Sequence, residues 1–524
     1  MVVIGAVIGL LLIACVNLAN AQLGRAILRD NEAAVRSALG ASKLQLIWSS
    51  LAESLILSTT GAITGILLGI GALNTFKHYA PVDLPRLIEV HLNFSALSFA
   101  VALTLSSTAL FGILPALRFV RSAPHAALQQ NTGLKLLGRQ GRRLRVCVIG
   151  LQVFGSTILL LVTGLFAKSL LHLLHEDKGF ETNHVVVAEA RLSSPLYASN
   201  QSRTEFIDKV LTNLRTIPGV ESTGFLSAMP LEGESWIEGI SRVDRPRVET
   251  ELINLRWVSP GYFETMGERL LEGRFFQEGD RMANSTVLSE GVAKALWQNQ
   301  NPLGGQVQIE GRKFSVIGVV GDSRSTSLKS APANMAYLHY IDRPPLATLF
   351  VVRGPQPSNQ LIPAVHHAIW QYAPNLAIAR VKTLDSQVSD SLASERFQST
   401  LLLAFGLAAL MLAVLGIYAV LSYSVAARTQ EIGIRMALGA SRHEMYSLTF
   451  GEAAMPVFAG LVAGLIAGTV AARLVQHLLY GVGAVDPSVS AAVAALFLLS
   501  AIVGAFIPAR RAASVDPIEA LRTE

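Results

Sequence analysis

Residues 430–468 read QEIGIRMALGASRHEMYSLTFGEAAMPVFAGLVAGLIAG, and this stretch decides the fold of the chain. Glu431 and Arg435 stand four residues apart, a spacing at which two side chains pair on one face of a short helix. Gly439 suits a left-handed helix end, and Ser441 with a glutamate three residues later forms a capping box that opens the next helix. The stretch therefore predicts a short helix, a break and a long helix, which form either an element that transmits movement or only a well-capped connection.

The same stretch occurs a second time near the start of the chain. Residues 31–69 align without a gap to residues 430–468, and 11 of the 39 positions are identical. A shorter match follows near the end of each copy. Because the repeat brings three apolar stretches with it each time, we predict a module of three membrane helices that occurs twice, at 1–128 and 396–524.

The composition is that of a membrane protein. Of the 524 residues, 51% are hydrophobic and 15% are charged, whereas soluble domains average about 25% charged. A helix needs about 20 apolar residues to cross a bilayer. Seven windows are long enough, one of them interrupted only by Glu53: residues 2–24, 44–76, 92–117, 146–167, 397–427, 453–472 and 487–509. We therefore predict an α-helical integral membrane protein with about seven transmembrane helices.

Residues 173–395 differ from the rest of the chain, because their polar composition is ordinary and they contain turn signals such as Pro218-Gly219. They predict one folded α+β domain outside the membrane, with two mixed α/β lobes. Its expected elements are a strand at 185–192, a helix at 202–216, a strand at 220–227 and a β-rich part at 252–340.

The distribution of basic residues predicts the orientation. The segments 24–43, 118–145 and 425–443 and the C-terminal tail together carry 17 Lys and Arg residues, whereas the connections on the other side carry two. Cytoplasmic loops are the Lys- and Arg-rich ones, so residues 173–395 and the N-terminus are expected outside the cytoplasm. No Lys or Arg precedes Arg25, which disfavours a signal peptide.

Each copy of the repeat also places a carboxylate inside its apolar helix. Glu53 and Glu452 lie about nine residues into their helices, or about 13 Å along the axis. An intramembrane carboxylate suggests an ion or proton relay by default, but no cationic partner recurs in the facing helices, so a helix-packing hydrogen bond is the favoured interpretation. The Gly-x-x-x-Gly-x-x-x-Gly ladders that follow predict close helix packing.

Motifs for enzymatic chemistry are absent from the sequence. The chain has no Gly-x-x-x-x-Gly-Lys-Ser/Thr phosphate loop, no His-Glu-x-x-His and no Gly-x-Ser-x-Gly. Its two cysteines, Cys15 and Cys147, lie in apolar stretches and predict neither a disulfide framework nor a zinc site. With a net charge of only +6, nucleic acid is not an expected partner. We therefore expect no enzymatic activity, no catalytic or cofactor-binding residues and no metal site.

At this point the motifs resemble a known family. Residues 426–440 (AARTQEIGIRMALGA) and 508–522 (PARRAA through DPIEALR) resemble the FtsX-like permease domain of MacB-type ABC transporters. The segments VSPGYF, GRFF, NPLG and IGVVGD within residues 258–322 are similar to the MacB-like periplasmic core domain of the duplicated permeases called ADOP. The resemblance covers essentially the whole chain.

The resemblance implies a division of the chain. Its parts are a first FtsX-like module of an incomplete half (1–128), a basic cytoplasmic linker (129–145), a helix that leads the second half (146–172), the extracytoplasmic core domain (173–395) and a second FtsX-like module with a cytoplasmic tail (396–524). In the first tail Ala123 and Ala126 replace the Asp516 and Glu519 of the second, which weakens its helix cap. The resemblance also implies a leading span and an outer domain ahead of the three spans of each half, and residues 1–128 fit only the three spans, so Met1 is expected to be an internal or misassigned start, or the product of a truncated gene.

The resemblance also implies a function. Such permeases rest on separate ABC ATPase subunits, which bind the ATP, and they relay the ATPase movement through the bilayer to export or extract a substrate on the outer face. The matching coupling positions in the two copies are Glu32, Arg36 and Gly40, and Glu431, Arg435 and Gly439. The expected location is the bacterial plasma (inner) membrane; a periplasmic adaptor or outer-membrane partner is left open. The alternatives are a transmembrane regulator of an envelope partner such as a cell-wall hydrolase, and a truncated non-functional remnant.

Overall fold

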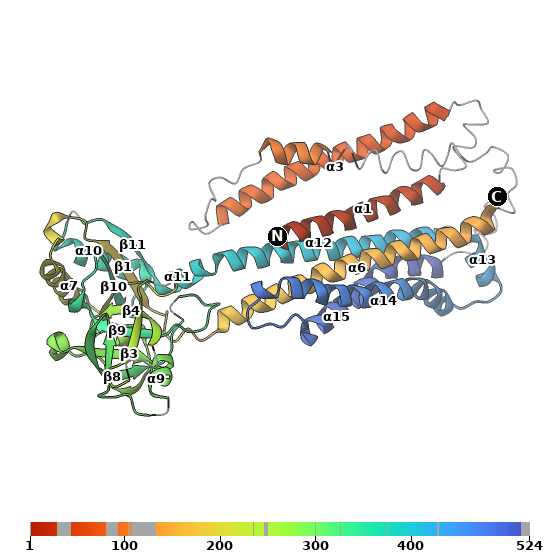
Figure 1. Cartoon of the computed structure of the whole chain (residues 1–524). Coiled ribbons are helices and arrows are strands. Elements are labelled where there is room, and N and C mark those ends of the chain that lie inside the picture. Colours follow the sequence, from red (N-terminus) through yellow and green to blue (C-terminus); the bar gives the residue numbers. More distant parts are fainter. Residues whose placement is uncertain are drawn as a thin grey trace. The chain divides into compact units, whose positions relative to one another are not determined.

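The computed structural model divides the chain into two compact units, which are described separately (Figure 1). The first unit comprises Met1–His172 and Glu395–Glu524, and the second comprises Leu173–Ser394. The structure describes residues 2–28, 43–79, parts of 93–106, and 133–514 except for 234, 246–249, 299, 325, 375 and 427–428.

The first unit is helical. Its long helices are α1 (Val2–Leu28), α3 (Lys43–Tyr79), α6 (Gly133–His175), α12 (Ala393–Ala426), α14 (Arg442–Leu474) and α15 (Pro487–Ala513). Within the described residues, α6, α12, α14 and α15 are long and apolar enough to cross a membrane, and α1 contains a shorter apolar part at Val2–Leu18. The four helices confirm the predicted membrane fold. The third predicted span of the first module, 92–117, lies mostly outside the described residues.

These four helices share one apolar core and lie side by side in Figure 1. The glycines of α14 determine how closely it approaches α6. A Cβ atom on Gly460 would lie 2.5 Å from the carbonyl oxygen of Gly150, and one on Gly464 would lie 2.6 Å from Cβ of Thr157. Such distances leave no room for any side chain, so the predicted glycine ladder packs directly on the backbone of α6.

A group of polar contacts joins α6 to the connection between α14 and α15. Lys168 donates a hydrogen bond to Asp486 over 2.6 Å, and Asp486 also caps the first turn of α15. Nearby, the hydroxyl of Ser169 accepts from the backbone N–H of Tyr480 over 2.7 Å. The Lys168 ammonium is the main reason that the pKa of Asp486 lies well below its usual range. The end of α6 is therefore fastened to the second module by charge as well as by packing.

The second unit is a mixed α/β domain built on an 11-stranded sheet, in which ten strands follow the order β11-β1-β10-β2-β4-β3-β7-β8-β6-β9 and β5 pairs with β8 off this path. The strands are β1 (Val185–Arg191), β2 (Ser222–Leu226), β3 (Ile237–Arg242), β4 (Thr250–Val258), β5 (Leu270–Gly273), β6 (Ser285–Ser289), β7 (Gln306–Ile309), β8 (Arg312–Val320), β9 (Met335–His339), β10 (Ala347–Arg353) and β11 (Ile378–Thr383). The expected strands at 185–192 and 220–227 are confirmed as β1 and β2, and the expected helix at 202–216 is α7 (Asn200–Leu214).

The sheet closes on itself in its β-rich part. Parallel pairing of β4 with β9 completes a ring in which β4, β3, β7, β8, β6 and β9 each contact the next. The other part is an open sheet of β11, β1, β10 and β2, on which α7 and α10 (Ser358–Trp370) pack. The two parts meet through the pair Leu226 and Val258 and share one hydrophobic core. The two expected lobes are therefore regions of a single sheet.

A carboxyl group is buried in the β-rich part. Glu268 follows the short helix α8 (Tyr262–Met266), and 6% of the residue is exposed. Its Oε1 accepts a hydrogen bond from the hydroxyl of Tyr262 over 2.8 Å and a longer one, 3.5 Å, from that of Tyr337. Burial raises the pKa of Glu268 to about 7, although the Tyr262 bond and the positive charge of Arg256 act in the opposite direction. The second unit, which we call the outer unit after its predicted position, thus contains an acid that binds a proton near neutral pH.

Candidate coupling site

The predicted coupling motif forms a short helix in the second copy of the repeat. This helix, α13 (Thr429–Ala437), follows α12 after two residues that are outside the described set. Arg435 donates a hydrogen bond of 2.5 Å to Glu431 one turn earlier, and both side chains are about half exposed. The pair stabilises the helix by only a few tenths of a kcal/mol, as such exposed pairs do. About half of the surface of each of these two charged side chains therefore remains exposed.

The break after α13 has the predicted geometry. Gly439 has φ of 95°, a left-handed conformation that other residues adopt only with strain. The backbone N–H of Ala440 donates to the carbonyl of Arg435 over 3.0 Å, which closes the helix end. Ser441 then caps α14, because its hydroxyl accepts from the backbone N–H of Glu444 while the Glu444 carboxylate accepts from the backbone N–H of Ser441. The helix, break and helix of the prediction are all present.

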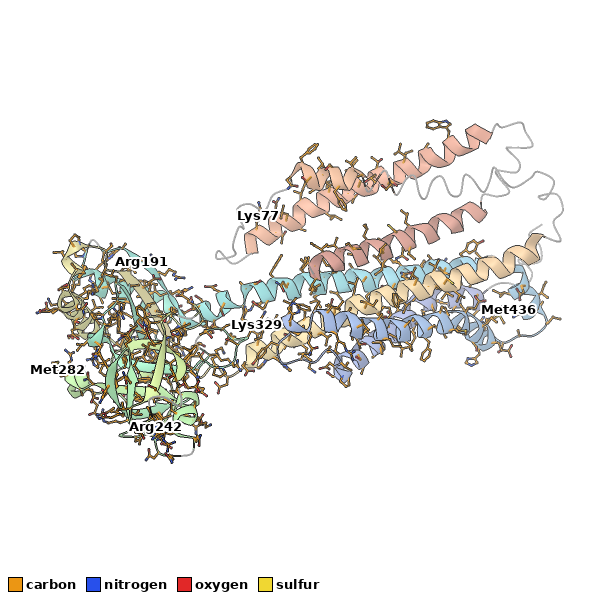
Figure 2. The ribbon with its side chains drawn as sticks, viewed as in Figure 1. Lys77, Arg191, Arg242, Met282, Lys329 and Met436 are labelled. Atoms are coloured by element: carbon orange, nitrogen blue, oxygen red, sulfur yellow. The ribbon has the colours of Figure 1, made fainter. Side chains whose placement is uncertain are left out.

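The helix α13 is seated on the two helices that follow it. Ile432, 4% exposed, packs in a buried cluster with Met445 of α14 and with Ala512 and Ala513 at the end of α15. Met436, which Figure 2 labels on α13, packs against the edge of the same cluster. A displacement of α13 must therefore move α14 and α15 with it or expose this apolar cluster to water.

The outward face of the element is apolar at its tip. Leu438 immediately precedes the left-handed glycine and is 83% exposed. It borders an open hollow of about 480 Å³ lined by Arg435, Leu438, Gly439, Ala440, Glu444, Met445 and Leu448. Arg435 of the ion pair lines the same hollow as Leu438. The sequence interpretation missed Leu438, although a leucine occupies the same place in both copies of the repeat.

The first-copy positions Glu32, Arg36 and Gly40 lie outside the described residues. So does the side chain of Glu53, whose backbone belongs to α3. Its counterpart Glu452 lies on α14 and accepts a hydrogen bond of 2.8 Å from the hydroxyl of Ser424 on α12. This bond joins two membrane helices, which is the packing role that the sequence favoured over a relay.

The structure provides no metal site in the part of the chain that it describes, because no three His, Cys, Asp or Glu side chains there are grouped to hold an ion. The site consists instead of a seated helix, an exposed leucine and a half-exposed ion pair.

The doubled helical module and the mixed sheet domain together define a membrane permease. The FtsX-like permease C-terminal family model matches residues 4–124 and 403–517, and the MacB-like periplasmic core domain model matches residues 146–370. The chain belongs to the MacB/FtsX-like ABC transporter permeases, as its motifs suggested. The family is a transporter component and not a conventional enzyme.

Two characterised relatives illustrate the similarity. The chain is 33% identical over 275 residues to the pyoverdine export ATP-binding/permease protein PvdT of Pseudomonas aeruginosa, which covers 50% of this chain and 41% of PvdT. It is 24% identical over 416 residues to the macrolide export ATP-binding/permease protein MacB of Acinetobacter baylyi, which covers 76% of this chain and 60% of MacB. The chain thus spans about half the length of these relatives.

Proposed function

We propose that this chain is the permease of a MacB-like export system in which a separate ABC ATPase binds α13 and drives the outer domain mechanically. ATP binds to that ATPase, since the 524 residues contain no phosphate loop. The membrane is the bacterial inner membrane, with residues 173–395 on the outer side. The names of the two relatives specify different cargoes, a macrolide and pyoverdine, and we assign no cargo to this chain.

The observation that carries the proposal is the seating of Ile432. Because this side chain is buried against α14 and α15, a partner that pushes on Leu438 moves three helices as one body. The ladder glycines lock α14 to α6, so the movement passes to α6. The helix α6 continues to His175, past the first residue of the outer unit, Leu173. The helix α12 begins at Ala393, before the last residue of that unit, Ser394.

A charge-reversal experiment tests the proposal. In the double variant Glu431→Lys, Arg435→Glu the intrahelical pair can still form, so we expect normal membrane insertion and an unchanged free energy of unfolding. The order of the two charges on the surface proposed to face the ATPase is inverted. The ATPase activity that co-purifies with the tagged permease should therefore fall at least about tenfold, as expected for a loss of complementary charge.

The chain offers a matched control at Glu290 and Lys294, an exposed ion pair with the same four-residue spacing in the outer unit. The reversal Glu290→Lys, Lys294→Glu should leave the co-purifying ATPase activity unchanged. Equal activity with both reversals would contradict the coupling role of α13. Co-purification with a cell-wall hydrolase, with no ATP-dependent export, would instead favour a regulator.

A further inference from the structure

The segment that joins α6 to β1, residues 176–184, is held by a loop that follows β8. The backbone N–H of Arg324 in this loop donates to the carbonyl oxygen of Lys178 over 2.9 Å. Its guanidinium forms an ion pair with Glu176 over 2.6 Å, and 12% of the Arg324 side chain is exposed. We call residues 322–324 the first clamp, because they hold the segment through a backbone hydrogen bond and a largely buried charge.

A second clamp holds the same segment a few residues later. The backbone N–H of Glu181 donates to the carbonyl oxygen of Met266, at the end of α8, over 2.8 Å. Arg353 of β10 pairs with the Glu181 carboxylate over 2.8 Å and donates to the carbonyl oxygen of Thr265 over 2.9 Å. We call residues 265–268 the second clamp. Two segments that are distant in sequence therefore fix the entry of the chain into the outer unit.

The buried carboxyl of Glu268 connects the two clamps. Glu268 is the last residue of the second clamp, and its Oε1 accepts a hydrogen bond from the hydroxyl of Tyr337 over 3.5 Å. The same hydroxyl is hydrogen-bonded to Ser323 of the first clamp, and both Tyr337 and Ser323 are buried. The other carboxyl oxygen of Glu268, Oε2, is buried and has no hydrogen-bond partner among the described residues. The carboxyl is thus linked to both clamps, and one of its two oxygens is unsatisfied.

The surroundings of Glu268 determine what its ionisation costs. The ionisable groups that face it are Tyr262 of α8, Tyr337 of β9 and Arg256 of β4. Burial raises the pKa of Glu268 to about 7 and outweighs the Tyr262 bond and the positive charge of Arg256, which act in the opposite direction. A buried carboxylate with an unsatisfied oxygen gains free energy by reaching water, and residues 265–268 must move for it to do so.

We propose that Glu268 is a proton-operated latch on the segment 176–184: the neutral carboxyl keeps both clamps closed, and loss of its proton to water releases them. The first clamp follows the second because Tyr337 joins Glu268 to Ser323. Within the function proposed above, release would weaken the transfer of movement from α6 to the outer unit. The latch and its test do not depend on that function.

Hydrogen exchange of the full chain in lipid nanodiscs tests the latch, with the amides of Arg324 and Glu181 as reporters of the first and second clamps. The parent is compared with Glu268→Gln, which is uncharged, at the same pH so that intrinsic exchange cancels. If the open clamp restores the ordinary pKa of 4.5, the parent should exchange up to about 300-fold faster than the variant at pH 8 and about twofold faster at pH 4.5. Because release exposes Glu268 only in part, we expect a difference of at least about tenfold at pH 8.

Two further variants separate the latch from a general effect on stability. Glu264→Gln makes the same change at an exposed position of α8 and should leave exchange at both amides unchanged. Tyr337→Phe keeps the aromatic ring and removes the hydroxyl that joins the clamps. In that variant the pH-dependent exchange should disappear at Arg324 and persist at Glu181.

Four results would overturn the proposal. The first is exchange at Arg324 and Glu181 that Glu268→Gln leaves unchanged at pH 8. The second is an equal slowing with Glu264→Gln. The third is exchange at both amides of the parent that is as slow at pH 8 as that of the slowest amides of β10, because the clamps would then open only when the whole outer unit unfolds. The fourth is pH-dependent exchange at Arg324 that Tyr337→Phe leaves intact.

Discussion

The buried acid of the outer unit allows a quantitative prediction for Glu268→Gln. An unfolded glutamate has a pKa of 4.5, whereas the folded pKa of Glu268 is about 7. Each unit of difference corresponds to about 1.4 kcal/mol, so the ionised carboxylate costs the folded state on the order of 3 kcal/mol above neutral pH. Glutamine keeps the acceptor for Tyr262 and carries no charge, and the variant should be more stable than the parent by up to about this amount.

The sign of the pH dependence follows from the raised pKa. Below pH 4.5 the carboxyl is protonated in both states and contributes no penalty. Between pH 4.5 and 7 the unfolded chain releases its proton first, so the free energy of unfolding of the parent falls as the pH rises, and above about 7 the loss is complete. The variant lacks this slope, and the gap between the two proteins should open across that interval.

Tryptophan fluorescence measures the effect directly. Four of the five tryptophans lie in the outer unit, at 236, 257, 297 and 370, so denaturant unfolding of the full chain in detergent reports on that unit. Curves at pH 4.5 and pH 8 would be compared, with the exposed Glu272→Gln as the control. An unchanged pH slope in Glu268→Gln, or a variant less stable than the parent at pH 8, would refute the reasoning.

Three further predictions concern the helical unit. Asp486→Asn should cost about 1 kcal/mol in thermal unfolding; because the folded pKa of Asp486 is lowered, the difference from the parent should vanish as the solution is acidified through that pKa. In Gly464→Leu the new side chain would collide with Thr157, so the free energy of unfolding should fall by about 1–3 kcal/mol. A melting temperature equal to that of the parent would contradict the packing. Leu438→Asp, at an exposed position, should leave melting unchanged and reduce the co-purifying ATPase activity; unchanged activity would count against Leu438 as a contact.

Local features of the structure could be predicted from the sequence, because they depend on neighbouring residues. The capping box at Ser441 and the left-handed Gly439 are set by a few positions in one short segment. Hydrophobic length alone identified α6, α12, α14 and α15. The family motifs added the nature of the outer domain, which the comparisons confirm.

Long-range features could not be predicted in this way. The ring closes because β4 pairs in parallel with β9, about 80 residues later, and no local pattern indicates that register. Glu268 follows a glycine at a helix end, a sequence that suggests a surface turn. In the structure it is buried, and its carboxylate accepts hydrogen bonds from the hydroxyls of Tyr262 and Tyr337. The ladder predicted close packing, but only the structure identified α6 as the partner of α14.

The closed ring also limits how outer domains can associate when they are crowded at a membrane surface. Strands with an unpaired edge promote aggregation between molecules, and ring closure removes most such edges. Among the described strands, β11 ends the open part of the sheet, and it carries Arg380 and Lys382. Charged residues on a terminal strand discourage the addition of a strand from another molecule. The two charges on β11 therefore disfavour polymerisation of this domain through the open part of its sheet.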